Sequence, residues 1–181
     1  MRQAKKEIKD MAVLTGLLNT SHVGRLGTIG ADGCPMIKPL NFAFTGQRLY
    51  FHTAMAGEKM EDIKRDPRVC FETDLPIALV KSRSEPCKAK YLFRSLIIKG
   101  KARIVEDRNE KLTALRLLME KYQPEGGYGN FLEEKLRITG VVCIEIEEMT
   151  GKEDLGNGAV RERILKILEE KKKLPVVMEP E

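Results

Sequence analysis

The sequence contains no tryptophan, and only 6% of its 181 residues are aromatic. Small barrels that bind nucleic acid usually interleave aromatic and basic side chains on one face of a sheet, where the bases stack on the rings. A chain with so few rings offers little material for such a face. We therefore expect no nucleic-acid partner.

Cysteine and histidine are also scarce. The chain has four cysteines and two histidines, and the cysteines form no CxxC pair, so the spacing typical of a zinc site is missing and no metal site is predicted. Cys70 and Cys143 lie in apolar runs and are expected to be reduced core residues. Cys34 and Cys87 are expected in loops.

Long hydrophobic runs are absent as well. No apolar stretch approaches the ~18 residues that a membrane-spanning helix needs, and the N-terminal segment MRQAKKEIKD is polar, unlike a secretion signal. We expect a cytoplasmic protein without a membrane partner. The net charge of +5 is small and dispersed. It suits an anionic ligand and nucleic acid equally, and so decides neither.

The hydrophobic content of 42% is that of an ordinary globular chain, and its patterning predicts an antiparallel fold. Apolar residues alternate with polar ones in several short runs, which indicates strands. The predicted strands cover residues 23–29, 35–44, 48–51, 69–72, 91–105 and 141–147. Short turns join the first three, which is typical of an antiparallel meander.

Helices are predicted from apolar spacing and capping residues. Asp10 can cap a first helix, Asp66-Pro67 ends a second over residues 55–65, and Asp107 with Glu110 forms a capping box for a third. A final amphipathic helix follows the Gly156-Asn157-Gly158 hinge. Residues 73–90, which include Pro76, Pro86 and the polar run 81–85, are predicted to form a long connection, and residues 149–152 a turn. The strand over residues 91–105 is either continuous or two strands joined by a bulge near Gly100. Six or so hairpin-linked strands with inserted helices favour an α+β antiparallel barrel.

The segment over residues 48–67 carries the clearest functional pattern. Its strand delivers His52 and Thr53 to a turn of small residues, and Lys59 falls in the first turn of the following helix. Free amides, the positive end of the helix dipole, a hydroxyl and an ammonium together suit an anion such as phosphate. Many such junctions bind nothing, and this one is neither a Walker loop nor a dinucleotide fingerprint, so both interpretations stay open.

Four segments in this order extend the pattern: GRLGTIGADGCPMIKPLNFAF, LYFHTAMAGEKMEDIKRDPRVCFE, FRSLIIKGKARIVED and VVCIEIEEMTGK. With them the chain resembles the FMN-binding split barrels related to pyridoxamine 5'-phosphate oxidase, and within that family it is most similar to the nitroimidazole-reductase-like branch. The resemblance implies a six-stranded antiparallel Greek-key split β-barrel with peripheral helices. It also implies a homodimer with flavin at the subunit interface, residues 1–152 as the FMN-binding domain, and residues 153–181 as a C-terminal helical extension.

The resemblance also implies roles for particular residues. Thr53 and Lys59 would bind the flavin phosphate, and Arg94 and Ser95 would reach that phosphate and the ribityl chain from a neighbouring strand. His52 would lie close to the ring or the phosphate and is the candidate catalytic residue. The strand whose backbone would lie along the isoalloxazine ring consists of Met36, Ile37, Lys38, Pro39, Leu40 and Asn41.

Two departures from the oxidase itself bear on activity. Gly57-Glu58 stands where the oxidase has a serine–arginine pair, and its C-terminal substrate motif has no match in MTGKEDLGNGAVRER. We therefore do not expect oxidation of pyridoxamine phosphate.

The function that the resemblance implies is an FMN-dependent oxidoreductase. It would pass electrons from a reduced nicotinamide or another donor to a small organic acceptor, with a nitroaromatic as the named candidate. The alternative is a flavin-binding or storage protein, or a redox sensor, without turnover of its own. FAD, a deazaflavin and haem remain alternatives to FMN.

Overall fold

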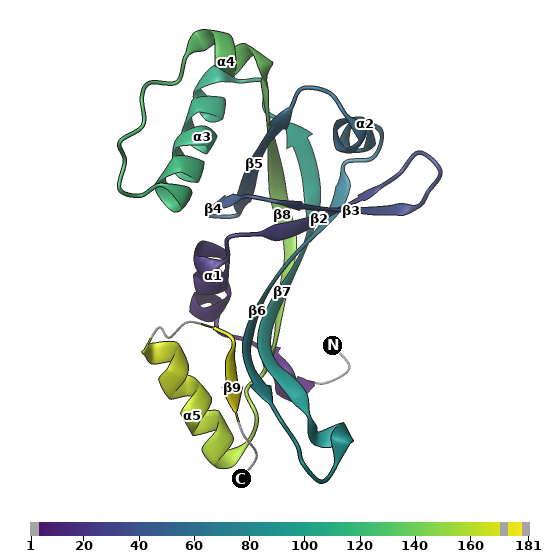
Figure 1. Cartoon of the computed structure of the whole chain (residues 1–181). Coiled ribbons are helices and arrows are strands. Elements are labelled where there is room, and N and C mark those ends of the chain that lie inside the picture. Colours follow the sequence, from purple (N-terminus) through teal and green to yellow (C-terminus); the bar gives the residue numbers. More distant parts are fainter. Residues whose placement is uncertain (1–3, 171–173, 179–181) are drawn as a thin grey trace. The chain divides into compact units, whose positions relative to one another are not determined.

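The computed structural model describes residues 4–170 and 174–178 (Figure 1). Its longer strands are β2 (Gly24–Ile29), β3 (Pro35–Leu40), β5 (Arg48–Ala54), β6 (Arg68–Val80), β7 (Lys90–Ile104) and β8 (Thr139–Asp154). Three short strands are β1 (Glu7–Ile8), β4 (Ala43–Thr45) and β9 (Val176–Met178). The α-helices are α1 (Met11–Thr20), α2 (Glu58–Arg65), α3 (Arg108–Tyr122), α4 (Glu133–Ile138) and α5 (Gly158–Glu169), and the 3₁₀ turns are η1 (Ala4–Lys6) and η2 (Pro86–Lys88).

The strands form one sheet in the order β3-β2-β6-β7-β8-β5-β4, with β1 beside β8 and β9 beside β6. The pairings with an assigned register are antiparallel, except that β9 runs parallel to β6. The predicted α+β antiparallel class is confirmed. The strand number is nine rather than six, because one predicted strand is divided in two and β1 and β9 were not predicted.

The chain forms two compact units. The first contains the described parts of Met1–Leu17, Asp74–Leu96 and Thr150–Glu181, and the second contains Leu18–Thr73 and Ile97–Met149. β6, β7 and β8 contribute residues to both units. The predicted domain boundary after residue 152 falls inside β8 and stays a prediction.

The strand predicted over residues 35–44 is interrupted after Leu40. Phe42 is fully buried, and its backbone N–H donates to the Tyr122 hydroxyl at 3.0 Å rather than to a neighbouring strand. The same hydroxyl donates to the His22 carbonyl at 2.8 Å. A side chain of α3 therefore satisfies the backbone at the point where the strand pairing stops.

Two segments predicted to be irregular belong to strands. Residues 73–80 continue β6, and residues 149–152 continue β8. In the first unit, Ala78 pairs with Val176 of β9, and Gly151 of β8 pairs with Ile8 of β1. The predicted turn is wrong, and the predicted connection is wrong for residues 73–80 but confirmed for residues 81–89 between β6 and β7. The strand partners that decide this lie far away in the sequence. Pro76 is tolerated because β9 pairs with β6 only from residue 78 onwards, so the Pro76 position has an open edge.

β7 is continuous, without a bulge at Gly100. A Cβ at this position would lie 2.2 Å from the Glu145 carbonyl oxygen. The glycine is therefore required by the close approach of β8 to β7.

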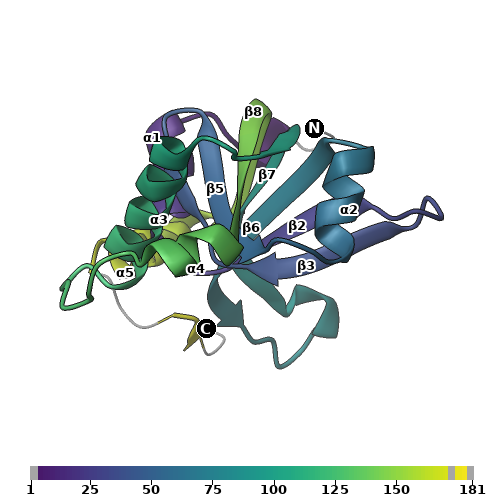
Figure 2. The same ribbon diagram turned by 90° about the horizontal axis from the view of Figure 1, so that it is seen from above.

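The second unit has an apolar core between α3, α4 and the strands β5 and β8. These two strands lie side by side in Figure 2. Leu115 and Leu118 of α3 are buried in it, as the helical stripe predicts, and α4 adds Leu136. Cys143 is buried, as predicted. Cys70 is exposed and the prediction for it is wrong, because in β6 its neighbours Val69 and Phe71 take the inward positions.

The first unit has its own core, in which α5 packs on β6, β7 and β9. This confirms the amphipathic helix predicted after residue 158. Its buried residues are Ile77, Ala78, Leu92, Leu155, Ile164, Ile167 and Met178. None of the helices in the described residues is long and apolar enough to cross a membrane.

The capping box predicted for α3 has one of its two hydrogen bonds among the described residues. The Asp107 side chain accepts a hydrogen bond from the Glu110 backbone at 2.7 Å. The Glu110 carboxylate instead accepts from Arg103 at 2.7 and 3.1 Å and from the Tyr50 hydroxyl at 2.9 Å. Burial, followed by the bond to Glu110, raises the pKa of Tyr50 to about 12. These contacts join α3 to β5 and β7 at the edge of the core.

A buried carboxylate holds α2 against β2. Asp62 is 2% exposed, and it accepts from the Thr28 hydroxyl and from the Arg65 guanidinium, both at 2.8 Å. The Arg65 and Thr28 hydrogen bonds hold the pKa of Asp62 below its usual value, in that order of size. Met60 and Ile63 are buried on the same face of α2. The position of the start of α2 therefore depends on Asp62.

We predict that Asp62→Asn lowers the free energy of unfolding by about 1–3 kcal/mol, because charge-assisted bonds are lost at a buried position. Urea unfolding measures the change. Glu61→Gln is the matched control, since Glu61 is exposed and pairs only with exposed Lys64, and it should change stability by less than about 0.5 kcal/mol.

The pH dependence has a defined sign. Because the folded pKa of Asp62 lies below its ordinary value of 3.8, the stabilisation is complete above that pH and is lost as the pH falls through the folded pKa. The stability difference between the wild type and Asp62→Asn should therefore shrink in acid. A difference that stays constant down to the acid transition would contradict this role.

Candidate functional site

The junction between β5 and α2 has the predicted strand–turn–helix form. β5 ends at Ala54, and α2 begins at Glu58 after Gly57. Gly57 has a φ of 122°, which side-chain-bearing residues rarely adopt, so the turn depends on glycine. The amides of Met60 and Glu61 bond to the Gly57 carbonyl. The first amides of the helix have no intrahelical acceptor and are available to a ligand.

Lys59 is a half-buried cation at this junction, and it has no acidic partner among the described residues. Its ammonium lies 5.9 Å from the centre of the Phe51 ring. Burial and, second, the positive charge of Lys38 lower the pKa of Lys59. Since the two cations repel each other, an anion bound between them would be favoured.

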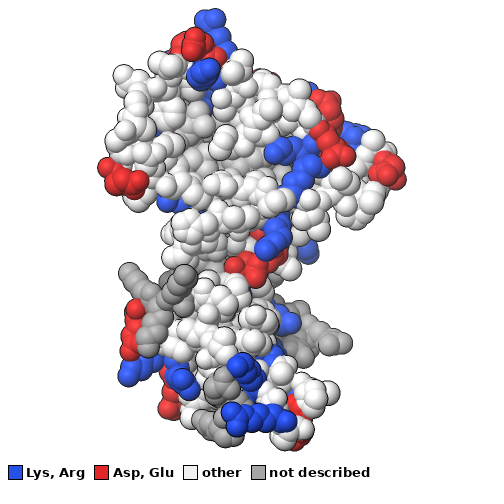
Figure 3. Space-filling view, viewed as in Figure 1, with Lys and Arg blue, Asp and Glu red and all other residues white. Residues whose placement is uncertain are grey.

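Lys38 forms an ion pair with Glu58 at the start of α2. Figure 3 shows acidic and basic side chains next to each other over this helix. The Thr53 hydroxyl is half-buried and makes no hydrogen bond within the part of the chain that the structure describes. Lys59, Thr53 and the first amides of α2 thus suit a phosphate, and Glu58 would compete with it for Lys38.

β3 lies at the edge of the sheet described here and pairs along its whole length with β2 only. An edge strand leaves backbone groups unpaired on its outer side. The side chains of Met36, Lys38 and Leu40 are half-buried, whereas Ile37 and Pro39 are exposed. This edge can supply backbone donors and acceptors to a flat ligand. The ring-binding role of residues 36–41 stays a prediction, and Asn41 lies just after β3.

Arg94 and Ser95 lie in the part of β7 that belongs to the first unit. Arg94 pairs with Glu153 at 3.0 Å, and both side chains are mostly buried. The Ser95 hydroxyl lies 3.5 Å from the Lys152 carbonyl. A protein carboxylate therefore already provides the partner that a buried Arg94 needs, and phosphate binding by these two residues stays a prediction.

His52 and Asn41 open onto a second feature of the second unit, a cavity of about 300 Å³. Both are exposed, and neither side chain has a hydrogen-bond partner among the described residues. Helices α3 and α4 supply most of the remaining walls, which are largely apolar. They consist of Leu115, Leu118, Met119, Tyr122, Phe131, Leu132, Lys135, Leu136 and Thr139.

The sequence did not predict several of these residues as part of a site. The α3 stripe indicates core residues, and Leu115 and Leu118 are buried as well as lining the cavity. α4 was not predicted at all. Its only advance signals are the apolar pair Phe131-Leu132 and the glutamates Glu133 and Glu134 in the first turn, where acidic residues favour a helix.

A family model described as pyridoxamine 5'-phosphate oxidase matches residues 11–153. The chain belongs to this family, as the resemblance in its sequence predicts, and its α+β antiparallel fold is that of the family's split barrels. No curated protein matches the sequence.

Solved structures agree with this assignment. A candidate 5-nitroimidazole antibiotic resistance protein from Bacteroides thetaiotaomicron is 25% identical, with a TM-score of 0.71 over 81% of this chain and 85% of that one. The flavocytochrome Anf3 from Azotobacter vinelandii is 21% identical, with a TM-score of 0.76 over 90% of this chain and 77% of that one. An FAD- and heme-binding protein from Mycobacterium smegmatis is 17% identical, with a TM-score of 0.75 over 89% and 79%. The last two similarities concern the fold alone.

We predict that inorganic phosphate raises the melting temperature of the wild type, and that Lys59→Met weakens phosphate binding about tenfold, because one charge-assisted bond is lost. Glu58→Gln should strengthen binding, since it removes the competing carboxylate. Thermal shift at a series of phosphate concentrations gives the affinities.

Lys64→Met is the matched control, because Lys64 is an exposed lysine of the same helix that pairs with Glu61. It should bind phosphate as the wild type does. An equal response from Lys59→Met and Lys64→Met would remove the anion site.

Proposed function

We propose that this protein is an FMN-dependent oxidoreductase that passes electrons from a reduced nicotinamide, or another donor, to a small organic acceptor such as a nitroaromatic. The observation that carries the proposal is Lys59, a half-buried cation between β5 and α2 that has no acidic partner in residues 4–170 and 174–178. Membership of the pyridoxamine 5'-phosphate oxidase family supports it. So does the similarity to a candidate nitroimidazole-resistance protein.

The residues of the junction suit the phosphate of a flavin mononucleotide. This group carries about two negative charges near neutral pH. Lys59 and the first amides of α2 would neutralise and orient it, and Thr53 would donate its free hydroxyl. For Arg94 and Ser95, which lie in the first unit, phosphate binding stays the expectation from the sequence. Two solved neighbours are named for flavin or FAD together with haem, so FAD, a deazaflavin and haem stay alternatives.

The edge of β3 would hold the ring through backbone contacts and keep it out of water. The bound flavin supplies the hydride chemistry itself. His52 is the residue proposed to contact the electron acceptor. An imidazole can donate a hydrogen bond with one nitrogen and accept one with the other. It can therefore hold a proton beside an acceptor that enters the adjoining cavity.

We also propose a homodimer with the flavin at its interface, in a reducing compartment such as the cytoplasm. A hollow of about 530 Å³, lined by apolar residues including Ile29, Ile37 and Val69, supports the dimer. Ile37 is 68% exposed there, which is costly in water unless another surface covers it. All four cysteines are free, as in proteins of reducing compartments.

The first test is flavin uptake. Wild-type protein incubated with FMN and desalted should be yellow, and Lys59→Met should hold FMN about tenfold more weakly, as expected for one lost charge-assisted bond. Lys64→Met should match the wild type. A colourless wild type would refute the proposal.

The second test is turnover. A reduced nicotinamide should bleach the flavin absorbance under nitrogen, and a nitroaromatic should restore it. Retention of flavin without bleaching by any donor would favour the alternative, a flavin-binding or sensing protein.

The dimer is tested separately. Ile37→Glu should shift the sedimentation coefficient towards that of a monomer and reduce flavin content, because a charge would be buried in the interface. Ile138→Glu, at an equally exposed isoleucine of α4, should do neither. Sedimentation of the wild type as a monomer would contradict the interface site.

A further inference from the structure

The cavity between α3, α4 and the end of β5 is lined by neither Thr53 nor Lys59, the residues proposed to bind the flavin phosphate. We propose that it binds a one- or two-ring aromatic carboxylate. That this carboxylate is the electron acceptor rests on the proposed function, whereas its binding to the cavity requires no flavin.

The size and lining of the cavity define the body of the ligand. Apolar cavities of about 150 Å³ in other proteins hold a benzene ring, so the volume of about 300 Å³ here suits one ring or two fused rings. Leu118, Met119 and Phe131 offer apolar and aromatic surface to such a ring. Leu132, which is 55% exposed, would lose contact with water when the ring enters.

The polar groups of the lining define the ligand's charge. Two of them are already satisfied, because the Tyr122 hydroxyl bonds to the His22 carbonyl and the Thr139 hydroxyl to the Lys135 carbonyl. Asn41, His52 and the Lys135 ammonium have no partner within the described residues. These three groups offer hydrogen-bond donors, and one of them is an ammonium.

No carboxylate lines the cavity, so nothing there neutralises Lys135. Of the two glutamates at the start of α4, Glu133 is held by Arg108 at 2.7 Å, and Glu134 is exposed and does not line the cavity. An acid group on the ligand would therefore meet the Lys135 ammonium and the hydrogen-bond donors of Asn41 and His52. A ligand with an amine would meet repulsion, and a neutral ligand would leave the ammonium without a partner.

The experiment uses 1-naphthoate, which is not a redox acceptor and whose fluorescence can be followed because the chain contains no tryptophan. Fluorescence titration of the full chain, with and without FMN, should show saturable binding. We expect 1-naphthoate to bind about tenfold more tightly than 1-naphthalenemethanol, which has the same rings without the charge. The amine 1-naphthylmethylamine should bind more weakly still.

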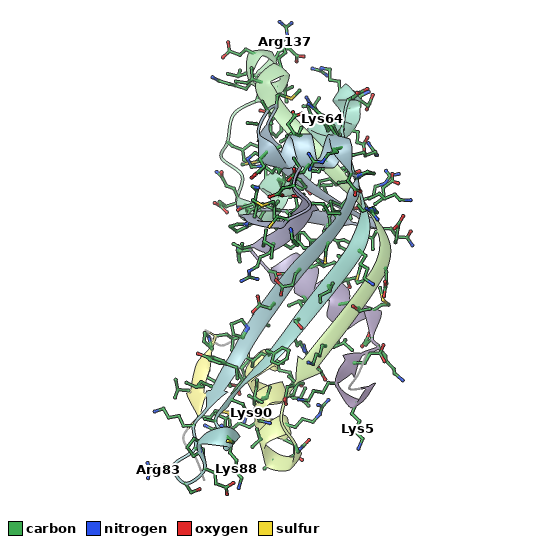
Figure 4. All side chains as sticks on the ribbon, turned by 90° about the vertical axis from the view of Figure 1, so that its right-hand side faces the viewer. Lys5, Lys64, Arg83, Lys88, Lys90 and Arg137 are labelled. Carbon is green, nitrogen blue, oxygen red and sulfur yellow. The ribbon has the colours of Figure 1, made fainter. Side chains whose placement is uncertain are left out.

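Two pairs of variants on α4 locate the probe. Lys135→Met should raise the dissociation constant about tenfold, whereas Arg137→Met, which removes a cation that points away from the ribbon in Figure 4 and does not line the cavity, should leave it within twofold. Leu132→Phe should take up part of the cavity and weaken binding, without adding a tryptophan to the chain. Ile138→Phe, at an exposed position outside the lining, should have no effect.

Three results would overturn the proposal: no saturable binding, equal binding of the acid and the alcohol, or equal losses in Lys135→Met and Arg137→Met. The outcome is separable from the flavin proposal. A protein that binds 1-naphthoate in this pattern but takes up no FMN has the acid site without the proposed reaction. A yellow protein that does not bind the probe keeps the reaction and loses the acid site.

Discussion

The buried carboxylate of Asp62 is the contact on which the candidate site depends. α2 has only eight residues, and a helix of this length is not stable in water without tertiary contacts. The Thr28 hydroxyl and Arg65 fix the carboxylate, and Lys38 adds a smaller electrostatic contribution that also lowers its pKa. The lysine that repels Lys59 thus helps to stabilise the anchor of the same helix. Lys38 therefore has two effects at the junction: it favours the charged Asp62 that stabilises the fold, and it disfavours the charged Lys59 unless an anion is bound.

Local chemistry made the junction predictable from sequence. Alternating residues indicate the strand, and Asp66-Pro67 marks the end of the helix. Thr53 and Lys59 lie six residues apart in the sequence, so the strand–turn–helix segment itself carries both to the junction. The same holds for the hairpin of β2 and β3, whose register runs without a break from Gly24–Leu40 to Ile29–Pro35.

Features that depend on distant partners could not be predicted in this way. Residues 73–80 contain a proline and polar side chains, and they become strand because α5 and β9 cover Ile77 and Ala78. Glu110 fits a capping box, but Arg103 and Tyr50 take its carboxylate. No pattern in the sequence marks Lys135 as a site residue, because the role proposed for it depends on the cavity between α3 and α4. Its helix has six residues and one buried side chain, too little for a periodic pattern to emerge.

The Tyr122 hydroxyl joins three separate parts of the second unit, since it belongs to α3, donates to His22 and accepts from Phe42 just after β3. Its ring is also a wall of the aromatic-acid cavity. A ligand that restricts the Tyr122 ring therefore also restricts the segment just after β3. The flavin ring is proposed to lie along the edge of β3. Thermodynamic linkage makes any such influence mutual: if occupancy of one place tightens the other, the reverse holds by the same factor. A single phenol would then make the two ligands cooperative without direct contact between them.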